Sequence, residues 1–425
     1  MKIQDLHSAF LANPSISTDT RKIKTNDIFF ALKGENFNGN LYAQKALDSG
    51  ASLVIIDEEE YILNDRTILV KDVLTALQEL ANFHRKYCSA KIISLTGSNG
   101  KTTTKELINT VLSKTYKTVA TKGNLNNHIG VPLTLLTIQP DTEIAIVEMG
   151  ANHLKEIEFL CKIAEPDFGY ITNFGKAHLE GFGGIEGVKK GKSELYDYLI
   201  LNNKSIFLNA DDQIQLEKLG TYTKKYGFSS ENSKYYNIKL VEAQPFVTIK
   251  VEDTIIKSNL IGAYNFTNCC AAIIIAKYFN VDLSEVKNAI EKYTPNNNRS
   301  QILNTNGHYI ILDAYNANPS SMTVALENFY SLKKDRKFLI LGDMFELGST
   351  AKEEHQNIAD LTKKLNFEQV LLIGENFNHT KTTATKLKSF DNLKDYLKEN
   401  QIQENSTILI KGSRGMALER VLDLI

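Results

Sequence analysis

From residue 91 onward, short apolar runs alternate with amphipathic stretches along the chain. Each run has the length of a strand, and most runs lead into a helical pattern. The runs lie at residues 92–95, 144–147, 168–171, 205–208, 310–312, 338–341, 370–373 and 407–410. Strands that alternate with helices are typical of βαβ units and parallel sheets. Two groups of such units predict two doubly wound α/β domains.

The segment before residue 91 has a different pattern. Short apolar segments at 28–32 and 52–56 are separated by turn residues, and a helical pattern at 74–87 follows them. We predict a separate small α/β domain there. A second boundary is predicted at Pro295, because the three asparagines that follow it favour an irregular linker. The predicted domains are residues 1–88, 89–298 and 299–425.

Composition and charge narrow the possible partners. The chain has 425 residues, with 49 Lys and Arg against 50 Asp and Glu. Without a strong basic field, binding of nucleic acid is not expected. The sequence shows neither a signal-peptide core nor a run long enough to span a bilayer, so we expect a cytoplasmic protein without membrane insertion. The four cysteines are expected to be buried, reduced thiols.

A glycine-rich loop follows the apolar run at 92–95 and leads into a helical pattern. A strand, a glycine turn and a helix start surround one point with backbone N–H groups, which form an anion cradle. Lys101 can reach the β- and γ-phosphates of a nucleotide, and the Thr102 hydroxyl can bind Mg²⁺. The loop departs from the strict Walker pattern, because Leu95 stands where that pattern has glycine. We predict an ATP-binding loop formed by Gly97, Ser98, Asn99, Gly100, Lys101, Thr102 and Thr103.

Three further polar residues follow predicted strands or lie on a predicted helix. In an open α/β sheet, ligands bind beyond the carboxyl ends of the strands. Glu148 ends the run at 144–147, and a carboxylate there is a usual partner of nucleotide-bound Mg²⁺. From spacing alone, a functional role is favoured only for Glu148, whereas His178 is explained as a loop histidine and Lys192 as one of several solvated lysines.

These residues belong to a series of motifs that resembles the Mur ligase family of peptidoglycan synthesis over essentially the whole chain. The motifs lie at residues 17–21, 31–34, 97–104, 123–132, 148–150, 172–183, 192–196, 313–319, 342–348 and 411–415. The resemblance implies an α/β protein of three domains. They are a small N-terminal α/β domain, a central P-loop-type doubly wound ATPase domain and a C-terminal Rossmann-like domain.

The resemblance also implies ATP, two Mg²⁺ ions and the residues that hold them. Thr102 and Glu148 resemble the ligands of one Mg²⁺. His178 and Lys192 match a second site, where the family's lysine is carbamylated. Lys189 and Lys190 are close alternatives, and Lys192 is favoured by register with the Ser-Glu-Leu-Tyr that follows it. Other residues that resemble nucleotide contacts are Asn265 and Asn268 for adenine, which are also explained by helix-start polarity, and Arg299 for phosphate.

The implied reaction joins D-alanyl-D-alanine to the terminal carboxylate of a UDP-N-acetylmuramoyl-tripeptide, with ATP as the energy source. The motif Asp-Asn-Pro-Arg, usual in the branch that adds diaminopimelate, is absent. Asn318 is either a substrate contact or the N-cap of a helix that begins at Pro319. The implied substrate-binding residues are Thr20, Arg21, Gly34, Asn126, Asn127, Asp313, Asn316 and Asn318.

Two alternatives remain open. One is another ligase of the same superfamily, such as a folylpolyglutamate synthase. The other is a P-loop nucleotide-binding protein that performs no ligation. The third residue of the tripeptide, diaminopimelate or lysine, is also left open. We expect a monomer.

Overall fold

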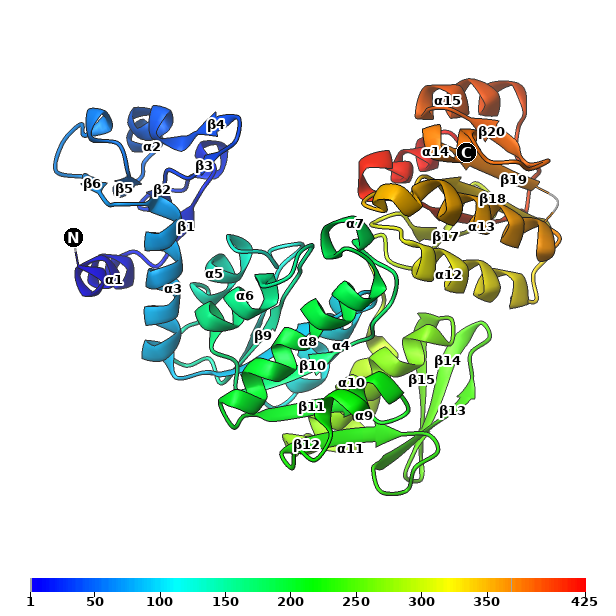
Figure 1. The fold of residues 1–425 in the computed structure, drawn as a ribbon, viewed down its shortest axis with the longest axis horizontal. Helices are drawn as coiled ribbons and strands as arrows, with labels where there is room; N and C mark the ends of the chain where they lie inside the picture. The colour runs from blue at the N-terminus through cyan, green and yellow to red at the C-terminus, as the bar shows by residue number, and fades with distance from the viewer. Residues whose placement is uncertain (1, 368) are drawn as a thin grey trace.

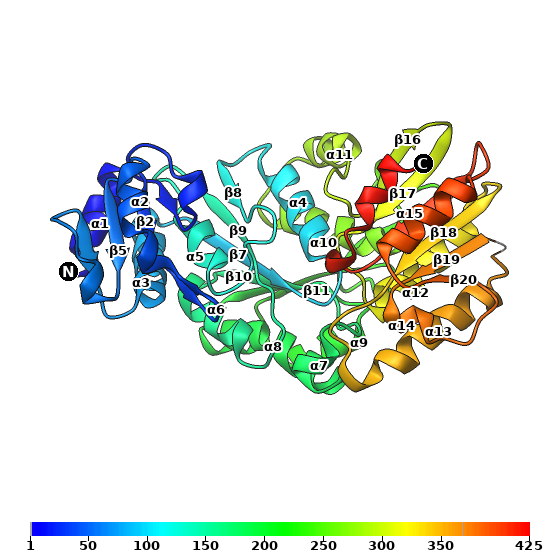
Figure 2. The same ribbon diagram turned by 90° about the horizontal axis from the view of Figure 1, so that it is seen from above.

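The chain folds into three lobes that follow one another in sequence order (Figure 1). A computed structural model describes residues 2–367 and 369–425. Figure 2 shows the N-terminal and C-terminal lobes at opposite ends of the molecule, with the central lobe between them. Each lobe contains a sheet with parallel strands and packed helices, so the predicted three-part α/β fold is confirmed.

The N-terminal lobe is built on a four-stranded parallel sheet in the order β1-β2-β5-β6. The predicted helix at 74–87 is present as α3, whose first turn is capped by the Asp72 carboxylate, since it accepts a hydrogen bond from the Thr75 N–H. The elements are α1 (Ile3–Ala12), β1 (Ile16–Ser17), β2 (Ile28–Phe30), β3 (Lys33–Gly34), β4 (Phe37–Asn38), α2 (Ala43–Asp48), β5 (Leu53–Ile56), β6 (Thr67–Leu69) and α3 (Val73–Cys88).

The central lobe contains a nine-stranded sheet in the order β15-β14-β13-β12-β11-β10-β7-β9-β8. Its strands are β7 (Lys91–Thr96), β8 (Thr118–Ala120), β9 (Ile144–Glu148), β10 (Phe168–Ile171), β11 (Ser205–Asn209), β12 (Lys225–Ser229), β13 (Tyr236–Glu242), β14 (Phe246–Val251) and β15 (Thr254–Ile261). Its helices are α4 (Lys101–Leu112), α5 (Gly130–Leu135), α6 (Glu156–Ala164), α7 (Leu179–Phe182), α8 (Ile185–Leu201), α9 (Gln213–Leu219), α10 (Tyr264–Tyr278) and α11 (Leu283–Lys292).

Helix α10 lies in the interior of the central lobe, where it packs against α4 and β11. Its residues from Cys269 to Ala276 are all buried. A helix that is apolar on every side is stable only when it is enclosed in this way. Cys269 and Cys270 are therefore buried thiols, as are Cys88 and Cys161, which confirms the expectation of unpaired, buried cysteines.

The C-terminal lobe contains a six-stranded sheet in the order β16-β17-β21-β18-β19-β20, in which the β16–β17 pair is antiparallel and the other described pairs are parallel. Residues 293–300, which the structure describes throughout, form no helix or strand, and the domain boundary at Pro295 stays a prediction. The elements are β16 (Gln301–Thr305), β17 (His308–Asp313), α12 (Pro319–Ser331), β18 (Lys337–Gly342), α13 (Ala351–Lys364), β19 (Gln369–Ile373), α14 (Glu375–Asn378), β20 (Thr385–Leu387), α15 (Phe390–Glu399) and β21 (Thr407–Lys411).

Within residues 2–367 and 369–425, no helix combines the length and the apolar character needed to cross a membrane.

Candidate active site

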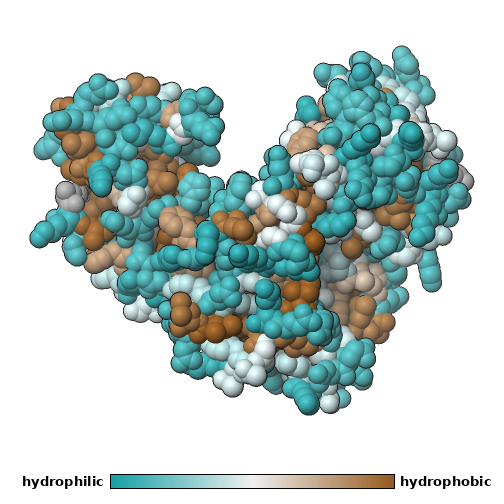
Figure 3. Space-filling model, viewed as in Figure 1, coloured by the Kyte–Doolittle hydropathy of each residue, from teal (hydrophilic) through white to brown (hydrophobic). Residues whose placement is uncertain are grey.

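A large cleft opens between the lobes and is visible as a hollow in the space-filling view (Figure 3). Its volume is about 1310 Å³. All three lobes contribute to its walls: Leu74 and Gln78 come from α3, the glycine loop comes from the central lobe, and Tyr315 comes from the C-terminal lobe. The cleft lies beyond the carboxyl ends of β7 and β17, which is where α/β sheets bind ligands.

The glycine loop joins the end of β7 to the start of α4. Gly97 and Gly100 both have positive φ, 143° and 79°. A Cβ atom on Gly97 would lie 2.0 Å from the Thr172 hydroxyl, and one on Gly100 would lie 2.6 Å from the Asn268 side chain. Both positions therefore require glycine, because the backbone has a positive φ and a side chain would collide with its neighbours. The Thr172 hydroxyl also donates a 2.6 Å hydrogen bond to the carbonyl of Asn99, which holds the loop in place.

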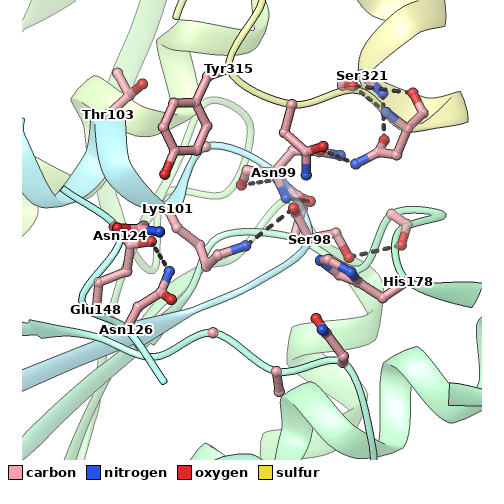
Figure 4. Close-up of a pocket in the computed structure, with 18 of the residues that line it drawn as sticks. Ser98, Asn99, Lys101, Thr103, Asn124, Asn126, Glu148, His178, Tyr315 and Ser321 are labelled. Carbon is pink, nitrogen blue, oxygen red and sulfur yellow. Dashed lines mark hydrogen bonds between the residues drawn. The ribbon is translucent and has the colours of Figure 1, made fainter. Parts of the chain in front are cut away.

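Lys101 folds back over this loop (Figure 4). Its Nζ donates hydrogen bonds to the carbonyl oxygens of Gly97 and Ser98, at 2.7 and 3.3 Å. The pKa of Lys101 is lowered to about 8, mainly by burial; the carboxylate of Glu148 opposes the shift, and the positive charge of Arg299 adds to it. A cation held by neutral carbonyl groups at a helix start is well placed to bind an anion.

Glu148 ends β9 and is 1% exposed. The Thr102 hydroxyl donates a 2.9 Å hydrogen bond to its Oε2, and the Asn126 amide donates a 2.8 Å bond to its Oε1. Figure 4 shows Asn126 and Glu148 side by side on one side of Lys101. The hydroxyl and carboxylate oxygens are the hard ligands that Mg²⁺ prefers, so this pair fits one Mg²⁺.

Lys192 is fully buried on α8, whereas Lys189 is partly exposed and pairs with Glu186, and Lys190 is exposed. The Lys192 Nζ donates a 2.9 Å hydrogen bond to the carbonyl of Ala151. Burial holds the pKa of Lys192 well below its ordinary value, and the nearby positive charge of Lys101 adds to this effect. A neutral lysine amine is the form that reacts with CO₂.

His178 lines the cleft on the opposite side of the loop from Glu148 (Figure 4). Its Nδ1 is hydrogen bonded to the Glu346 carboxylate of the C-terminal lobe. In the part of the chain that the structure describes, no group of three or more His, Cys, Asp and Glu side chains could hold a metal ion by itself. A metal at either predicted position would therefore need the Thr102 hydroxyl, phosphate oxygens or a modified lysine as additional ligands.

Asn265 and Asn268 lie in the first turns of α10, and both line the cleft. Their side chains also stabilise the local fold. The Asn268 Oδ1 accepts a hydrogen bond from the Thr104 hydroxyl at 3.0 Å, and its Nδ2 donates to Asn265 at 2.9 Å. Contact of Asn265 and Asn268 with adenine remains a prediction. The hydrogen bonds of both side chains also give them a role in the local fold.

Tyr315 and Lys411 line the cleft but were not among the predicted site residues. The Arg299 guanidinium lies 3.9 Å from the centre of the Tyr315 ring, and its Nε is buried without a hydrogen-bond partner among the described residues. The Lys411 Nζ forms a 2.5 Å ion pair with Asp313, which faces it in the neighbouring strand. Both residues belong to motifs that the sequence analysis named. The fold, rather than a local pattern, brings Tyr315 to Arg299 and Lys411 to Asp313.

Asn318 is the N-cap of α12, as predicted: its Oδ1 accepts a 2.9 Å hydrogen bond from the Ser321 N–H, and Pro319 follows it. Its Nδ2 donates a 2.8 Å hydrogen bond to the Asn99 side chain of the glycine loop. Asn318 therefore links the C-terminal lobe to the loop. Asn316 is exposed in the cleft wall, and its Oδ1 accepts a hydrogen bond from the Ala317 N–H.

The structure places the N-terminal candidates away from the glycine loop. Thr20, Arg21 and Gly34 are not among the described residues that line the cleft. Arg21 forms an ion pair with Asp19, and its hydrogen bonds lower the pKa of that carboxyl to about 2. Asn127 lines the cleft, but its Oδ1 accepts hydrogen bonds from the N–H groups of Ile129 and Gly130 at the start of α5.

Family models match each lobe in turn. A model described as "Mur ligase family, catalytic domain" matches residues 14–85, "Mur ligase middle domain" matches 95–276, and "Mur ligase, glutamate ligase domain" matches 298–414. A relative from Bacillus subtilis, UDP-N-acetylmuramoyl-tripeptide--D-alanyl-D-alanine ligase, is 34% identical, covering 100% of this chain and 97% of the relative.

Solved structures agree with these matches. MurF from Acinetobacter baumannii superimposes with a TM-score of 0.84 at 28% identity, covering 96% of this chain and 93% of that one. MurF ligase from Thermotoga maritima, solved in complex with ADP, has a TM-score of 0.84 at 26% identity and covers 96% of each chain. The matches extend over all three lobes. The chain belongs to the Mur ligase family.

Proposed function

We propose that this protein is an ATP-dependent ligase that joins D-alanyl-D-alanine to the terminal carboxylate of a UDP-N-acetylmuramoyl-tripeptide, in the synthesis of peptidoglycan precursor. One observation carries the proposal. The hydrogen bond from Asn318 to Asn99 places a wall of the C-terminal lobe directly against the glycine loop. A phosphoryl group on this loop would thus face a second substrate held by the C-terminal lobe. The full-length relative from Bacillus subtilis carries the name of this activity.

The nucleotide phosphates bind at the glycine loop, where backbone N–H groups and Lys101 meet them. Thr102 and Glu148 hold one Mg²⁺, as their adjacent oxygens allow. When bound, Mg²⁺ neutralises charge on the β- and γ-phosphates and orients them. Asn265 and Asn268 contact adenine, and Arg299 contacts phosphate from the start of the C-terminal lobe. The related enzyme from Thermotoga maritima was solved with ADP, which supports a nucleotide site of this kind.

The reaction proceeds in two steps that share the same phosphoryl group. A carboxylate oxygen of the tripeptide attacks the γ-phosphorus, the bond to ADP breaks, and an acyl phosphate forms. The amine of D-alanyl-D-alanine then attacks the acyl carbon, the amide bond forms, phosphate leaves and the amine loses a proton. Lys101 stabilises charge on the transferred group and holds it in line for attack, which is the main contribution a protein makes to phosphoryl transfer.

A second ion is proposed at His178 and Lys192. Lys192 is the one lysine of the three candidates that is fully buried, and its lowered pKa favours the neutral amine. Reaction of that amine with CO₂ forms a carbamate, whose anionic oxygens suit Mg²⁺. The carbamate oxygens are metal ligands that an unmodified lysine side chain lacks.

The UDP-linked substrate is proposed to reach from the N-terminal lobe into the cleft. Thr20, Arg21 and Gly34 are the proposed contacts of the uridine-diphosphate sugar, and Asn126 and Asn127 are further proposed substrate contacts. Asp313, Asn316 and Asn318 are proposed to hold the incoming dipeptide. We further infer a monomer that works in the cytoplasm, where its nucleotide substrates are available.

Hydroxylamine trapping tests the acyl-phosphate route. With ATP, Mg²⁺ and the UDP-tripeptide present but the dipeptide omitted, hydroxylamine is expected to yield a tripeptide hydroxamate. If the complete reaction runs and no hydroxamate forms, a concerted route replaces the two-step one. The same assay separates the alternatives. A folylpolyglutamate synthase would use a folate and glutamate instead, and a non-ligating protein would release phosphate without requiring a carboxylate and an amine together.

Two asparagines of the C-terminal lobe are expected to behave differently when replaced. Asn316→Ala should raise the apparent Michaelis constant for D-alanyl-D-alanine and leave that for ATP little changed, because an exposed amide in the cleft wall can donate and accept. Asn318→Ala should lower the melting temperature, since loss of an N-cap costs roughly 0.5–2 kcal/mol. Steady-state kinetics and thermal melts on both variants separate the roles. Unchanged dipeptide dependence in Asn316→Ala removes Asn316 from the site.

A further inference from the structure

The loop after β18 contacts the predicted metal site from the C-terminal lobe. Glu346 lies in this loop, and its Oε2 is hydrogen bonded to Nδ1 of His178, which is 168 residues earlier in the chain. The backbone carbonyl of Glu346 also accepts a 3.3 Å hydrogen bond from the N–H of Glu180. Two contacts therefore dock Glu346 on the segment that carries His178. The motif at residues 342–348 has no part in the function as described so far.

The structure holds this loop in a restrained conformation. Glu346 has a φ of 60°, a left-handed conformation that side chains rarely adopt. Asp343, at the start of the loop, is buried and accepts hydrogen bonds from the N–H groups of Asn376 and Phe377. The Phe345 N–H donates to the Ser413 hydroxyl at 2.9 Å. The unfavourable backbone conformation is thus maintained by its surroundings, as is common for residues with a functional task.

A carboxylate on one histidine nitrogen determines what the other nitrogen can do. When Nδ1–H donates to a carboxylate, Nε2 keeps its lone pair, and the ring orientation is fixed. Carboxylate partners of this kind orient histidines that bind metals. The His178 side chain is 18% exposed and lines the cleft, whereas the Glu346 side chain is 51% exposed.

We propose that Glu346 is the positioning residue for His178. From the C-terminal lobe it fixes the tautomer in which Nε2 of His178 is free to bind Mg²⁺ in the cleft. The metal site is consequently complete only while the C-terminal lobe is docked on the central lobe. This inference rests on the proposed role of His178 as a metal ligand.

A second ion pair between the same two lobes provides a control. The Lys176 Nζ lies 2.7 Å from the Glu354 Oε1 of α13, whereas the hydrogen bond to the His178 ring comes from Glu346. Glu354→Gln and Glu346→Gln thus remove the same charge from the same interface. If Glu346 only helped to dock the lobes, the two substitutions would have similar effects.

The test measures binding of Mn²⁺, as a spectroscopic substitute for Mg²⁺, by electron paramagnetic resonance with a non-hydrolysable ATP analogue present. Wild-type protein is expected to bind two ions. Glu346→Ala should weaken one of them about 10–100-fold, as is typical when the carboxylate partner of a metal-bound histidine is lost. Glu346→Gln, whose amide oxygen can still accept the hydrogen bond, should lie between Glu346→Ala and wild type. Glu354→Gln should bind both ions as wild type does.

Two results would overturn the proposal. One is wild-type Mn²⁺ binding by Glu346→Ala in a protein that melts at the wild-type temperature. The other is an equal loss in Glu354→Gln, which would reduce Glu346 to a docking contact. A failure of the proposed function would look different from a failure of the Glu346 proposal. Wild-type protein would then form no product from the UDP-tripeptide and the dipeptide. Wild-type protein that ligates normally but binds a single Mn²⁺ would exclude the His178 site itself, and the inference with it.

Discussion

Lys101→Ala is expected to lower kcat/KM by ~10³-fold or more, the range found when a charge-stabilising group is removed from a phosphoryl-transfer or oxyanion site. The reason is the position of Lys101 at the start of α4. Within the part of the chain that the structure describes, its Nζ donates hydrogen bonds to the neutral carbonyl groups of Gly97 and Ser98, so a bound phosphate becomes its principal charged partner. Phosphate release with both substrates present measures the effect.

The fold should survive this substitution. Lys101 is not among the buried residues of the core, and its Nζ is hydrogen bonded to carbonyl groups of the glycine loop. Lys114→Ala, which removes an exposed lysine just beyond the end of the same helix, is the matched control and should keep wild-type activity. Near-normal phosphate release by Lys101→Ala would remove Lys101 from the phosphate site.

Lys192→Ala should be nearly inactive, and small carboxylates such as formate or acetate should restore part of the activity. The rescue is expected because a free carboxylate can occupy the space left by the side chain and supply the missing anionic oxygens. Lys189→Ala and Lys190→Ala should be milder, since these lysines are at or near the surface of α8. Activity with and without added carboxylate, measured for all three variants, checks the prediction.

The rescue matters because Lys192 is fully buried, and its loss could disturb packing. A packing defect would not respond to small carboxylates, whereas a missing metal ligand would. A severe and rescuable loss in Lys190→Ala would place the modified lysine two residues earlier. Loss of activity in Lys192→Ala without any rescue would contradict carbamylation.

Most parallel strands of the central and C-terminal lobes were predictable because they are buried on both faces. Such strands are continuous apolar runs, and β7 and β18 are examples. The parallel strands β8, β12 and β20 were not predicted, and β8 and β20 are only partly buried. The antiparallel strands β13 and β14 were not predicted. In β14, buried residues alternate with more exposed ones, and β13 is exposed over most of its length. Neither strand contains a continuous apolar run, so the pattern that located the other strands could not locate these.

The candidate site was predictable where its parts are close in sequence. The glycine loop, from Gly97 to Thr103, needs only a strand, a turn and a helix start, and all three are local patterns. The contacts between lobes were not predictable. Asn318 reaches Asn99 over 219 residues, and Glu346 reaches His178 over 168 residues. These pairings depend on how two separately folded domains dock, which no local pattern specifies.

The most direct test of the central claim is mass spectrometry of the product formed from ATP, Mg²⁺, D-alanyl-D-alanine and a UDP-N-acetylmuramoyl-tripeptide. Tripeptides ending in diaminopimelate and in lysine should both be offered, because the preferred third residue is open. The predicted result is a UDP-linked pentapeptide, heavier than the tripeptide by one D-alanyl-D-alanine less one water, formed with one ADP and one phosphate per product. ATP hydrolysis without any pentapeptide from either tripeptide would contradict the account.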